Sequence, residues 1–508
     1  MKFKDSLLRV ITHSKHFYII IASVCVSIFF LEINATIFWG IIVITLSAYI
    51  LFNTELQLYL FVFSLPYIGV GVLKSVFDIS IGTGIQPSFV FAGLLFVTLI
   101  FKLLISGFTI IIPKSKVNLI LLLFLFVVIM SLGMSFFIPY SEFRGEIPFI
   151  KSIKQIVQLS LMILVYFLLI IYLNTETKIY KVFNVLLFTG LIASVYGLYQ
   201  FIGYYLGLPG TNLFNSNVGF ATAENSKLFL GSSFTDLLRI RATAPEPAMF
   251  GNFLLCVIPI QTSLVLSKYS IKKRNYVYLL IMLVAFLLTF SKGAFLALFV
   301  SLLIVIKYIN QNQDYKRMLF KLFLIILFIA LVFSGLISFF LNTSLLSAIG
   351  FIGDRMYQII NPNDISNLTR LSSYIAAIKM ILYFPIFGVG FGNFGFYYFQ
   401  FSPSLNIPEH FYWPVSNNIY LNVFSELGLI GIILFMLIII FLLRESKSLI
   451  NLTKNDIYWH TISIGLFASL IGILIQFFTI SSFNYPHVWF IIASIISIRT
   501  VYLNSQTV

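Results

Sequence analysis

Charged residues are scarce in this chain. Asp, Glu, Lys and Arg make up 10% of its 508 residues, whereas soluble domains carry roughly 25%. Hydrophobic residues make up 60%, Phe alone occurs 57 times, and the mean hydropathy is +1.02. A soluble core cannot bury that much apolar surface, so the composition predicts side chains that face lipid or pack between membrane helices.

Cysteine is nearly absent as well. The two cysteines, Cys25 and Cys256, both lie inside apolar runs, which excludes a disulfide framework and a zinc site. We expect neither a metal nor an organic cofactor.

The formal net charge is +15, but the basic residues do not gather into one patch interleaved with aromatics, so no nucleic-acid partner is expected. They separate the apolar runs instead. The first run, from Phe17 to about Leu31, follows a basic start and lacks a small-residue cleavage site. This pattern indicates an uncleaved first membrane span.

The apolar runs are long enough to cross a bilayer as helices, which takes about 20 residues each. The predicted spans are 17–32, 35–52, 57–73, 88–106, 117–139, 155–173, 182–206, 247–267, 276–290, 293–309, 319–341, 417–443, 458–480 and 484–503. The fold class is therefore an all-α integral membrane protein with about 14 transmembrane helices.

The positive-inside rule sets the orientation, because cytoplasmic loops hold the excess of Lys and Arg. With the N- and C-termini cytoplasmic, 21 of the 32 basic residues fall inside, including the run Lys272-Lys273-Arg274. The two long hydrophilic stretches, 207–246 and 342–416, then fall outside, and the larger one lies between helices 11 and 12.

These features divide the chain into three regions, without a fixed-period repeat, a low-complexity linker or a soluble domain. Residues 1–206 hold transmembrane helices 1–7, 207–443 hold both large outer loops and are where we expect a functional site, and 444–508 hold the C-terminal helices. Inside the larger loop, residues 369–383 have the apolar spacing of an amphipathic helix at the outer surface.

Two arginines and a carboxylate lead from the first outer loop into the eighth span. The stretch reads Arg239-Ile-Arg241-Ala-Thr-Ala-Pro245-Glu246-Pro247. Guanidinium groups bind phosphate oxygens in pairs and keep their charge, so this pair suits a pyrophosphate at the membrane surface. Alternatively, the arginines pair with Glu246 or lipid headgroups, and Glu246 caps the helix that begins at Pro247.

Other polar residues on the outer side are candidates with simpler alternatives. Lys292 lies in a tight turn, where it could contact an anionic ligand or extend to headgroups. His410 is the only histidine in the two large outer loops, which makes it a general-base candidate. The aromatic run that follows it suits sugar stacking or an interfacial belt. The glycine-rich run from Pro385 to Asn393 follows no strand, so it predicts a close-approach turn and no dinucleotide site.

Three segments together resemble the O-antigen ligase superfamily, which includes Wzy-type polysaccharide polymerases. They are Leu288-Thr-Phe-Ser-Lys-Gly-Ala-Phe-Leu-Ala297; Arg370-Leu371 with Pro385-Ile-Phe-Gly-Val-Gly-Phe-Gly-Asn393; and Ser416-Asn417-Asn418-Ile-Tyr420-Leu421 with Glu426-Leu-Gly-Leu-Ile-Gly431. The similarity covers about residues 239–443.

The resemblance implies a metal-independent, inverting glycosyltransferase in the bacterial cytoplasmic (inner) membrane. Its donor would be an undecaprenyl-diphosphate-linked oligosaccharide, used on the periplasmic or exterior face. Arg241, with Arg239 beside it, and Arg370 match the family's arginines. Lys292, Asn417 and Asn418 join them as expected substrate-binding residues.

One departure from the family pattern bears on the chemistry. Ligases of this superfamily commonly have His-Asn before the aromatic-Leu pair, and here the histidine position is Asn417. Asparagine cannot act as a base at neutral pH. Either Glu246 or His410 is then the base, or the chemistry depends mainly on positioning and leaving-group stabilisation.

The missing histidine favours a polymerase of O-antigen, capsule or exopolysaccharide repeat units, whose acceptor is another lipid-linked unit. A ligase or protein O-oligosaccharyltransferase differs only in acceptor. A transporter of lipid-linked oligosaccharides is the alternative from another class, although repeated halves and charged mid-membrane helices are not found. Membrane lipids, a flippase and a chain-length regulator are the expected partners.

Overall fold

The computed structural model describes residues 53–69, 86–106, 112–139, 141–211, 238–267, 273–309, 365–403 and 413–506, with a few isolated positions elsewhere. Contacts divide the chain into two units: residues 1–61 with 90–109, and residues 62–89 with 110–508. We describe each unit by itself.

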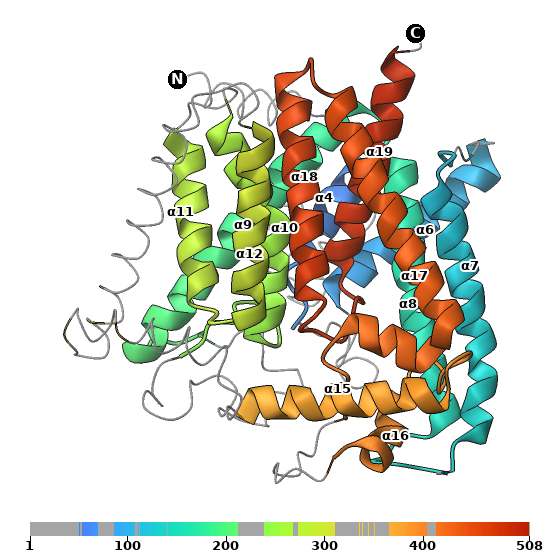
Figure 1. Cartoon of the computed structure of the whole chain (residues 1–508). Coiled ribbons are helices and arrows are strands. Elements are labelled where there is room, and N and C mark those ends of the chain that lie inside the picture. The colour runs from blue at the N-terminus through green and yellow to red at the C-terminus, as the bar shows by residue number, and fades with distance from the viewer. Residues whose placement is uncertain are drawn as a thin grey trace, which may run out of the picture. The chain divides into compact units, whose positions relative to one another are not determined.

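The regular secondary structure of the described residues is mainly helical, and an isolated β-bridge pairs Phe143 with Glu146. Figure 1 shows the helices and labels all of them except the 3-10 helix η1. They are α4 (Thr54–Ser64), α6 (Pro87–Ser106), α7 (Lys116–Met130), the 3-10 helix η1 (Ser131–Phe137), α8 (Pro148–Tyr172), α9 (Glu176–Tyr205), α10 (Pro247–Leu266), α11 (Lys273–Leu287), α12 (Lys292–Ile309), α15 (Ile365–Tyr383), α16 (Phe394–Phe401), α17 (Ile419–Leu452), α18 (Ile457–Gln476) and α19 (Pro486–Gln506).

Nine helices in the described part are long and apolar enough to cross a membrane, and α11 is a shorter apolar helix. This confirms the all-α membrane fold class. The predicted spans 17–32, 35–52 and 319–341 lie outside the described residues, apart from isolated positions. The predicted continuous span 57–73 is wrong, because α4 ends at Ser64 and turns follow. Pro66 explains this end, since proline disfavours helix in the residue before it.

In the first unit, α4 and α6 are joined by a polar contact. The Gln57 side-chain amide and the Thr98 hydroxyl exchange hydrogen bonds of 3.0 and 3.2 Å. Both side chains are buried, and mutual pairing removes the cost of burying them.

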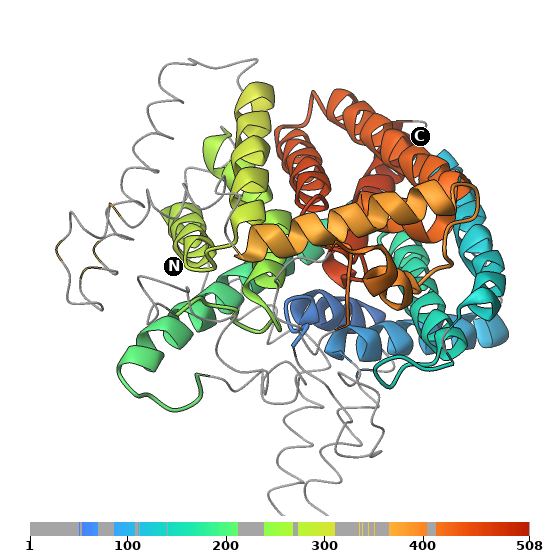
Figure 2. The same cartoon turned by 60° about the horizontal axis from the view of Figure 1, so that its bottom comes forward.

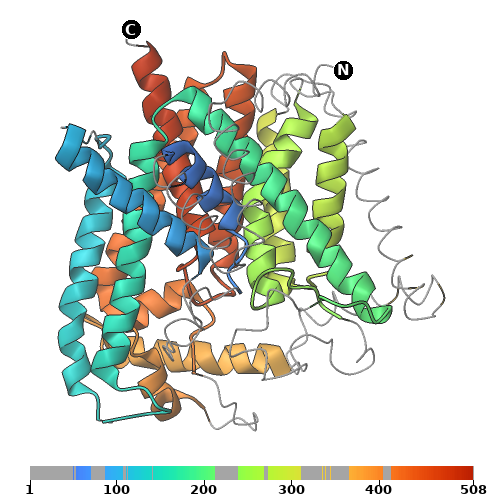
Figure 3. The same ribbon diagram turned by 180° about the vertical axis from the view of Figure 1, so that it is seen from behind.

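In the second unit, α10 is the central helix. Every residue from Pro247 to Leu266 is buried except Ala248 and Met249, as expected for a helix that is apolar on all sides. α10 packs against α11, α12 and α18. Figure 3 shows α9 running obliquely across the back of these helices. In contrast, α7 exposes Leu119 and Phe126 by 62% and 57%, which suits a face toward lipid.

Helix α15 lies across one end of the upright helices instead of joining them (Figures 1 and 2). Its buried face carries small residues, among them Ser373, Ala376 and Ala377, and its exposed face carries Leu371, Ile378 and Leu382. The helix predicted at 369–383 is therefore confirmed, with a start four residues earlier.

The glycine-rich run packs against a kink in α17. Gly388, Gly390 and Gly392 all have positive φ, as does Gly428 at the kink. A Cβ added at Gly428 would lie 2.2 Å from the Ile386 carbonyl oxygen, and one at Gly388 would lie 2.4 Å from the backbone of α17. The predicted close-approach turn is thus confirmed, because only glycine fits both surfaces.

A buried carboxylate stabilises this junction. Glu426 is 4% exposed, and its two carboxylate oxygens accept hydrogen bonds from the Phe394 amide (3.2 Å) and the Asn422 side chain (3.0 Å). The Gly390 amide also donates to the Glu426 carbonyl oxygen at 2.8 Å. These bonds hold α16 and the glycine-rich run on the kinked helix.

Replacing Gly428 by alanine should destabilise the protein by about 2 kcal/mol or more, because the left-handed backbone and the 2.2 Å contact both disfavour a Cβ. The melting temperature of the purified protein in detergent measures this loss. Gly133→Ala is the matched control, since no atom lies within 4 Å of its added Cβ. Equal melting temperatures for the two variants would contradict the close-packing argument.

Candidate functional site

The candidate site lies at the end of the second unit where α10 and α12 begin, α18 ends and α15 crosses. The segment 239–246, called here the arginine arm, enters this end directly before α10. Its backbone is held by a side chain of α9: the Gln200 Oε1 accepts hydrogen bonds from the Arg241 and Ala242 backbone amides at 3.0 and 3.1 Å. Ala242 has a φ of 47°, so the arm turns sharply here.

The Arg241 side chain is buried and only partly satisfied. It is 5% exposed, and its Nη1 donates to the Pro245 carbonyl at 3.2 Å. Its Nε has no hydrogen-bond partner in the described part of the chain, and no ion pair is found for Arg241 there. Burial lowers the pKa of this guanidinium, although the nearby Tyr196 and Glu246 act in the opposite direction. A buried cation in this state is costly and favours an anionic ligand.

Glu246 does not cap α10 with its side chain. It occupies the N-cap position with Pro247 at the first helical position, but its carboxylate makes no capping hydrogen bond. The capping interpretation is therefore wrong. The half-buried carboxylate lies close enough to both Arg241 and Tyr485 to affect their charge equilibria.

Arg239 contacts the turn between α11 and α12, and Lys292 directly follows this turn. The Arg239 Nε donates to the Thr289 carbonyl at 3.1 Å, and Phe290 has a φ of 47° in the same turn. Lys292 begins α12 and is half-buried. The next residue, Gly293, packs so closely on Thr479 that an added Cβ would overlap the threonine side chain. The start of α12 is thereby fixed against the end of α18.

Arg370 reaches the same region from α15. It is half-buried and lies close to Tyr374, where its charge opposes the rise that burial causes in the tyrosine pKa. The Tyr374 hydroxyl donates to the Phe478 carbonyl at 2.9 Å. Because Phe478 precedes Thr479, the α15 contact lies next to the α12 contact on the end of α18.

The two asparagines differ in what they do. Asn417 has a φ of 55°, and its side chain donates to the Ser373 hydroxyl of α15 at 3.4 Å. Asn418 caps α17, since its Oδ1 accepts a hydrogen bond from the Leu421 amide at 3.1 Å. Asn417 therefore faces the Arg370 helix, whereas the Asn418 oxygen is used in the fold.

His410 lies outside the described residues. Trp413, the first described residue after it in the sequence, is packed on several sides. Lys151 lies 4.4 Å from its ring centroid, Phe396 packs edge-on at 4.8 Å, and Gly395 leaves room for the indole. This packing favours a structural role for Trp413 over sugar stacking.

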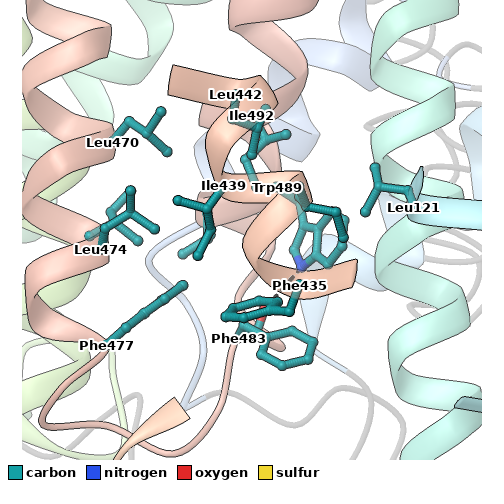
Figure 4. Close-up of a pocket in the computed structure, with 13 residues that line it drawn as sticks. Leu121, Phe435, Ile439, Leu442, Leu470, Leu474, Phe477, Phe483, Trp489 and Ile492 are labelled. Carbon is teal, nitrogen blue, oxygen red and sulfur yellow. Dashed lines mark hydrogen bonds between the residues drawn. The ribbon is translucent and has the colours of Figure 1, made fainter. Parts of the chain in front are cut away.

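A wholly apolar pocket lies between α7, α17, α18 and α19 (Figure 4). Phe435, Phe477, Phe483 and Trp489 are among its lining residues. The Phe477 carbonyl accepts a hydrogen bond from the Ile419 amide at 2.9 Å. The pocket lining thus connects directly to the start of α17, next to Asn417 and Asn418.

Sequence reasoning quoted Glu426 in a motif but gave it no role, and it assigned no role to three polar residues within spans: Asn252, Gln476 and His487. All four are buried and hydrogen-bonded. These four residues are polar but lie inside apolar runs. Polar residues are rare within membrane spans and often mark functional sites, so this pattern could have identified them.

Comparisons with known proteins bear on residues 277–436, which match a family model described as O-Antigen ligase. A search of curated proteins finds no match. The matched segment includes Lys292, Arg370, Asn417 and Glu426, and the arginine arm precedes it. The resemblance predicted from the sequence motifs is confirmed there: over residues 277–436, this multi-pass membrane chain is similar to the O-antigen ligase family.

Proposed function

We propose that this protein transfers a glycan from a lipid-linked diphosphate donor to a second lipid-linked glycan, as a polymerase on the outer face of the bacterial cytoplasmic membrane. The observation that carries the proposal is Arg241, a buried guanidinium with an unpartnered Nε in the described part of the chain. It lies at the end of the bundle that also receives Arg239, Lys292 and Arg370. A diphosphate supplies the charge and the acceptor atoms that such a site needs.

The chemistry is a displacement at the anomeric carbon. The acceptor hydroxyl oxygen forms the new bond, the bond to the diphosphate oxygen breaks, and the anomeric centre is inverted. The leaving diphosphate takes the electron pair, and the guanidinium groups stabilise its charge. Glu246, whose carboxylate lies close enough to Arg241 to affect its charge, accepts the hydroxyl proton; His410 is the second candidate for this role.

The apolar pocket suits a short segment of the donor's lipid chain. Its lining contains no polar surface, and it connects to the start of α17 beside Asn417. An isoprenoid chain placed there would leave its diphosphate at the polar end of the bundle, which is how an amphipathic donor partitions at a membrane surface.

Asn417 in place of a histidine favours the polymerase. A ligase is the second candidate, and the match of residues 277–436 to a family model described as O-Antigen ligase favours it. The two functions differ in the acceptor, so both retain the same roles for Arg241, Arg370 and Glu246.

Arg241→Ala should reduce glycan transfer by about 100-fold or more, since a preorganised group that stabilises leaving charge contributes on this scale. Arg370→Ala should act in the same direction. Transfer rates with a purified lipid-diphosphate glycan measure both effects. Lys379→Ala, an exposed cation on the same helix as Arg370, is the control and should retain normal rates. Normal rates in both arginine variants would remove the diphosphate-binding role.

Glu246→Gln should lower kcat by about 100-fold to 10,000-fold while the protein still binds donor, because the amide cannot accept a proton. His410→Ala is the parallel variant. Loss confined to His410→Ala would assign the base to that histidine. Full activity in both variants would show that leaving-group stabilisation carries the reaction without either base.

Deleting the gene should leave single repeat units on the final lipid anchor and abolish the ladder of longer chains, because a polymerase is needed only for elongation. Polysaccharide gels of the deletion strain measure this. Long polymer retained on undecaprenyl diphosphate would instead identify a ligase and overturn the interpretation of Asn417.

A further inference from the structure

Three polar side chains lie fully buried just inside the end of the bundle that carries the candidate site. They are Asn252 in the second turn of α10, Gln476 at the end of α18 and His487 at the start of α19. Each is 0% exposed. Burying polar groups is costly unless they hydrogen-bond to one another, so their arrangement is strongly constrained.

The three side chains form a hydrogen-bonded chain that ends on the backbone of α10. The Gln476 Nε2 lies 3.1 Å from the Ala248 carbonyl oxygen, the Asn252 Nδ2 lies 2.7 Å from the Gln476 Oε1, and the His487 Nε2 lies 2.7 Å from the Asn252 Oδ1. The Ala248 carbonyl can only accept a hydrogen bond, so it fixes which atom is the donor in every other link.

Each link then fixes the next one. Gln476 must point its amide hydrogens at Ala248, so its oxygen faces Asn252. Asn252 must donate to that oxygen, so its own oxygen faces His487. His487 therefore carries a hydrogen on Nε2, and the fold selects this tautomer.

The remaining surroundings of His487 are aromatic. Its Nδ1 is buried and has no hydrogen-bond partner among the described residues. The Tyr485 ring stacks on the imidazole at 5.6 Å and 10°, and Phe253 packs edge-on at 5.7 Å. The hydrogen bond to Asn252 is thus the polar contact that fixes the ring.

The hydrogen-bonded chain of side chains ends in the first turn of α10, next to Glu246. Ala248 lies two residues after Glu246, whose carbonyl accepts the first helical hydrogen bonds of α10, from Met249 and Phe250. Gln476 also accepts, through its backbone carbonyl, a 2.9 Å bond from the hydroxyl of Thr479, against which the residue after Lys292 packs. One set of contacts therefore ties the starts of α10, α12 and α19 to the end of α18.

We propose that His487 is a positioning residue for glycan transfer: through Asn252 and Gln476 it holds the first turn of α10, and with it Glu246 and the arginine arm, in the geometry that the reaction needs. This inference rests on the proposed function, and it adds a residue from α19, outside the segment that matches the family model.

Two amide replacements of the histidine distinguish positioning from general packing. In His487→Gln the side-chain amide nitrogen reaches about the place of Nε2 and can donate to Asn252. In His487→Asn the amide is one carbon shorter and cannot. We expect His487→Gln to retain kcat within a few-fold and His487→Asn to lose about 100-fold in kcat, with KM for the donor unchanged, as misplacement of reacting groups produces.

Removing the hydrogen bond between Gln476 and the Ala248 carbonyl tests the positioning role without changing the histidine. Gln476→Met keeps the side-chain length but removes the bond to Ala248, so it should reproduce the kcat loss of His487→Asn. Equal losses in His487→Gln and His487→Asn, or full activity in Gln476→Met, would overturn the positioning role even if one variant folds poorly.

A measurement that needs no activity separates this inference from the proposed function. Nuclear magnetic resonance of the protein labelled with nitrogen-15 histidine reads the tautomer directly. The His487 signal is the one that is lost in His487→Gln. In the wild-type protein it should show a protonated Nε2 and an unprotonated Nδ1. A protonated Nδ1 would overturn the chain while leaving glycan transfer untouched. Absence of transfer by the wild-type protein, with the Nε2 tautomer present, would instead count against the proposed function.

Discussion

The burial of α10 on all sides is the constraint on which the rest of the second unit depends. A helix that meets protein on every face must have neighbours that approach closely, and small residues provide this at each contact. Gly465 of α18 leaves room for Ile260, Gly190 of α9 leaves room for Val257, and Ala294 of α12 lies 3.1 Å from the position of a Cβ on Gly251. Any sliding of α10 would force larger groups into these places, so its register is fixed.

A fixed α10 determines where polar atoms can be placed. The Ser469 hydroxyl reaches the Cys256 carbonyl, and the Gln261 side chain reaches the Asn275 carbonyl across to α11. Asn252 lies one to two turns from the start of the same helix. Its side chain is hydrogen-bonded to both Gln476 of α18 and His487 of α19. The arginine arm is the direct continuation of this helix, so rigidity of α10 is passed to Arg241 and Glu246 through a few backbone bonds.

Sequence patterns predicted the parts of this structure that local chemistry decides. The start of α10 at Pro247, the surface helix predicted at 369–383 and the glycine-rich turn all follow from residues that act on their own backbone or on a single face. The roles of Asn252, Gln476 and His487 could not be predicted, because they come from three separate helices and depend on tertiary register. Asn418 shows the same limit: its motif suggested a ligand contact, whereas its oxygen caps α17.

Glu426 and Arg241 are two buried ionisable side chains to which the fold gives different hydrogen-bond partners. Both are about 95% buried and both lie next to a sharp backbone turn. Glu426 receives hydrogen bonds on both oxygens, from Phe394 and Asn422, so the fold itself supplies what a buried carboxylate needs. The Arg241 guanidinium donates to one backbone carbonyl, that of Pro245, and its Nε has no hydrogen-bond partner in the described part of the chain. The fold gives both Glu426 oxygens a hydrogen-bond partner but leaves the Arg241 Nε without one in the described part of the chain, and an anionic ligand that completes the arginine's contacts is the simplest explanation.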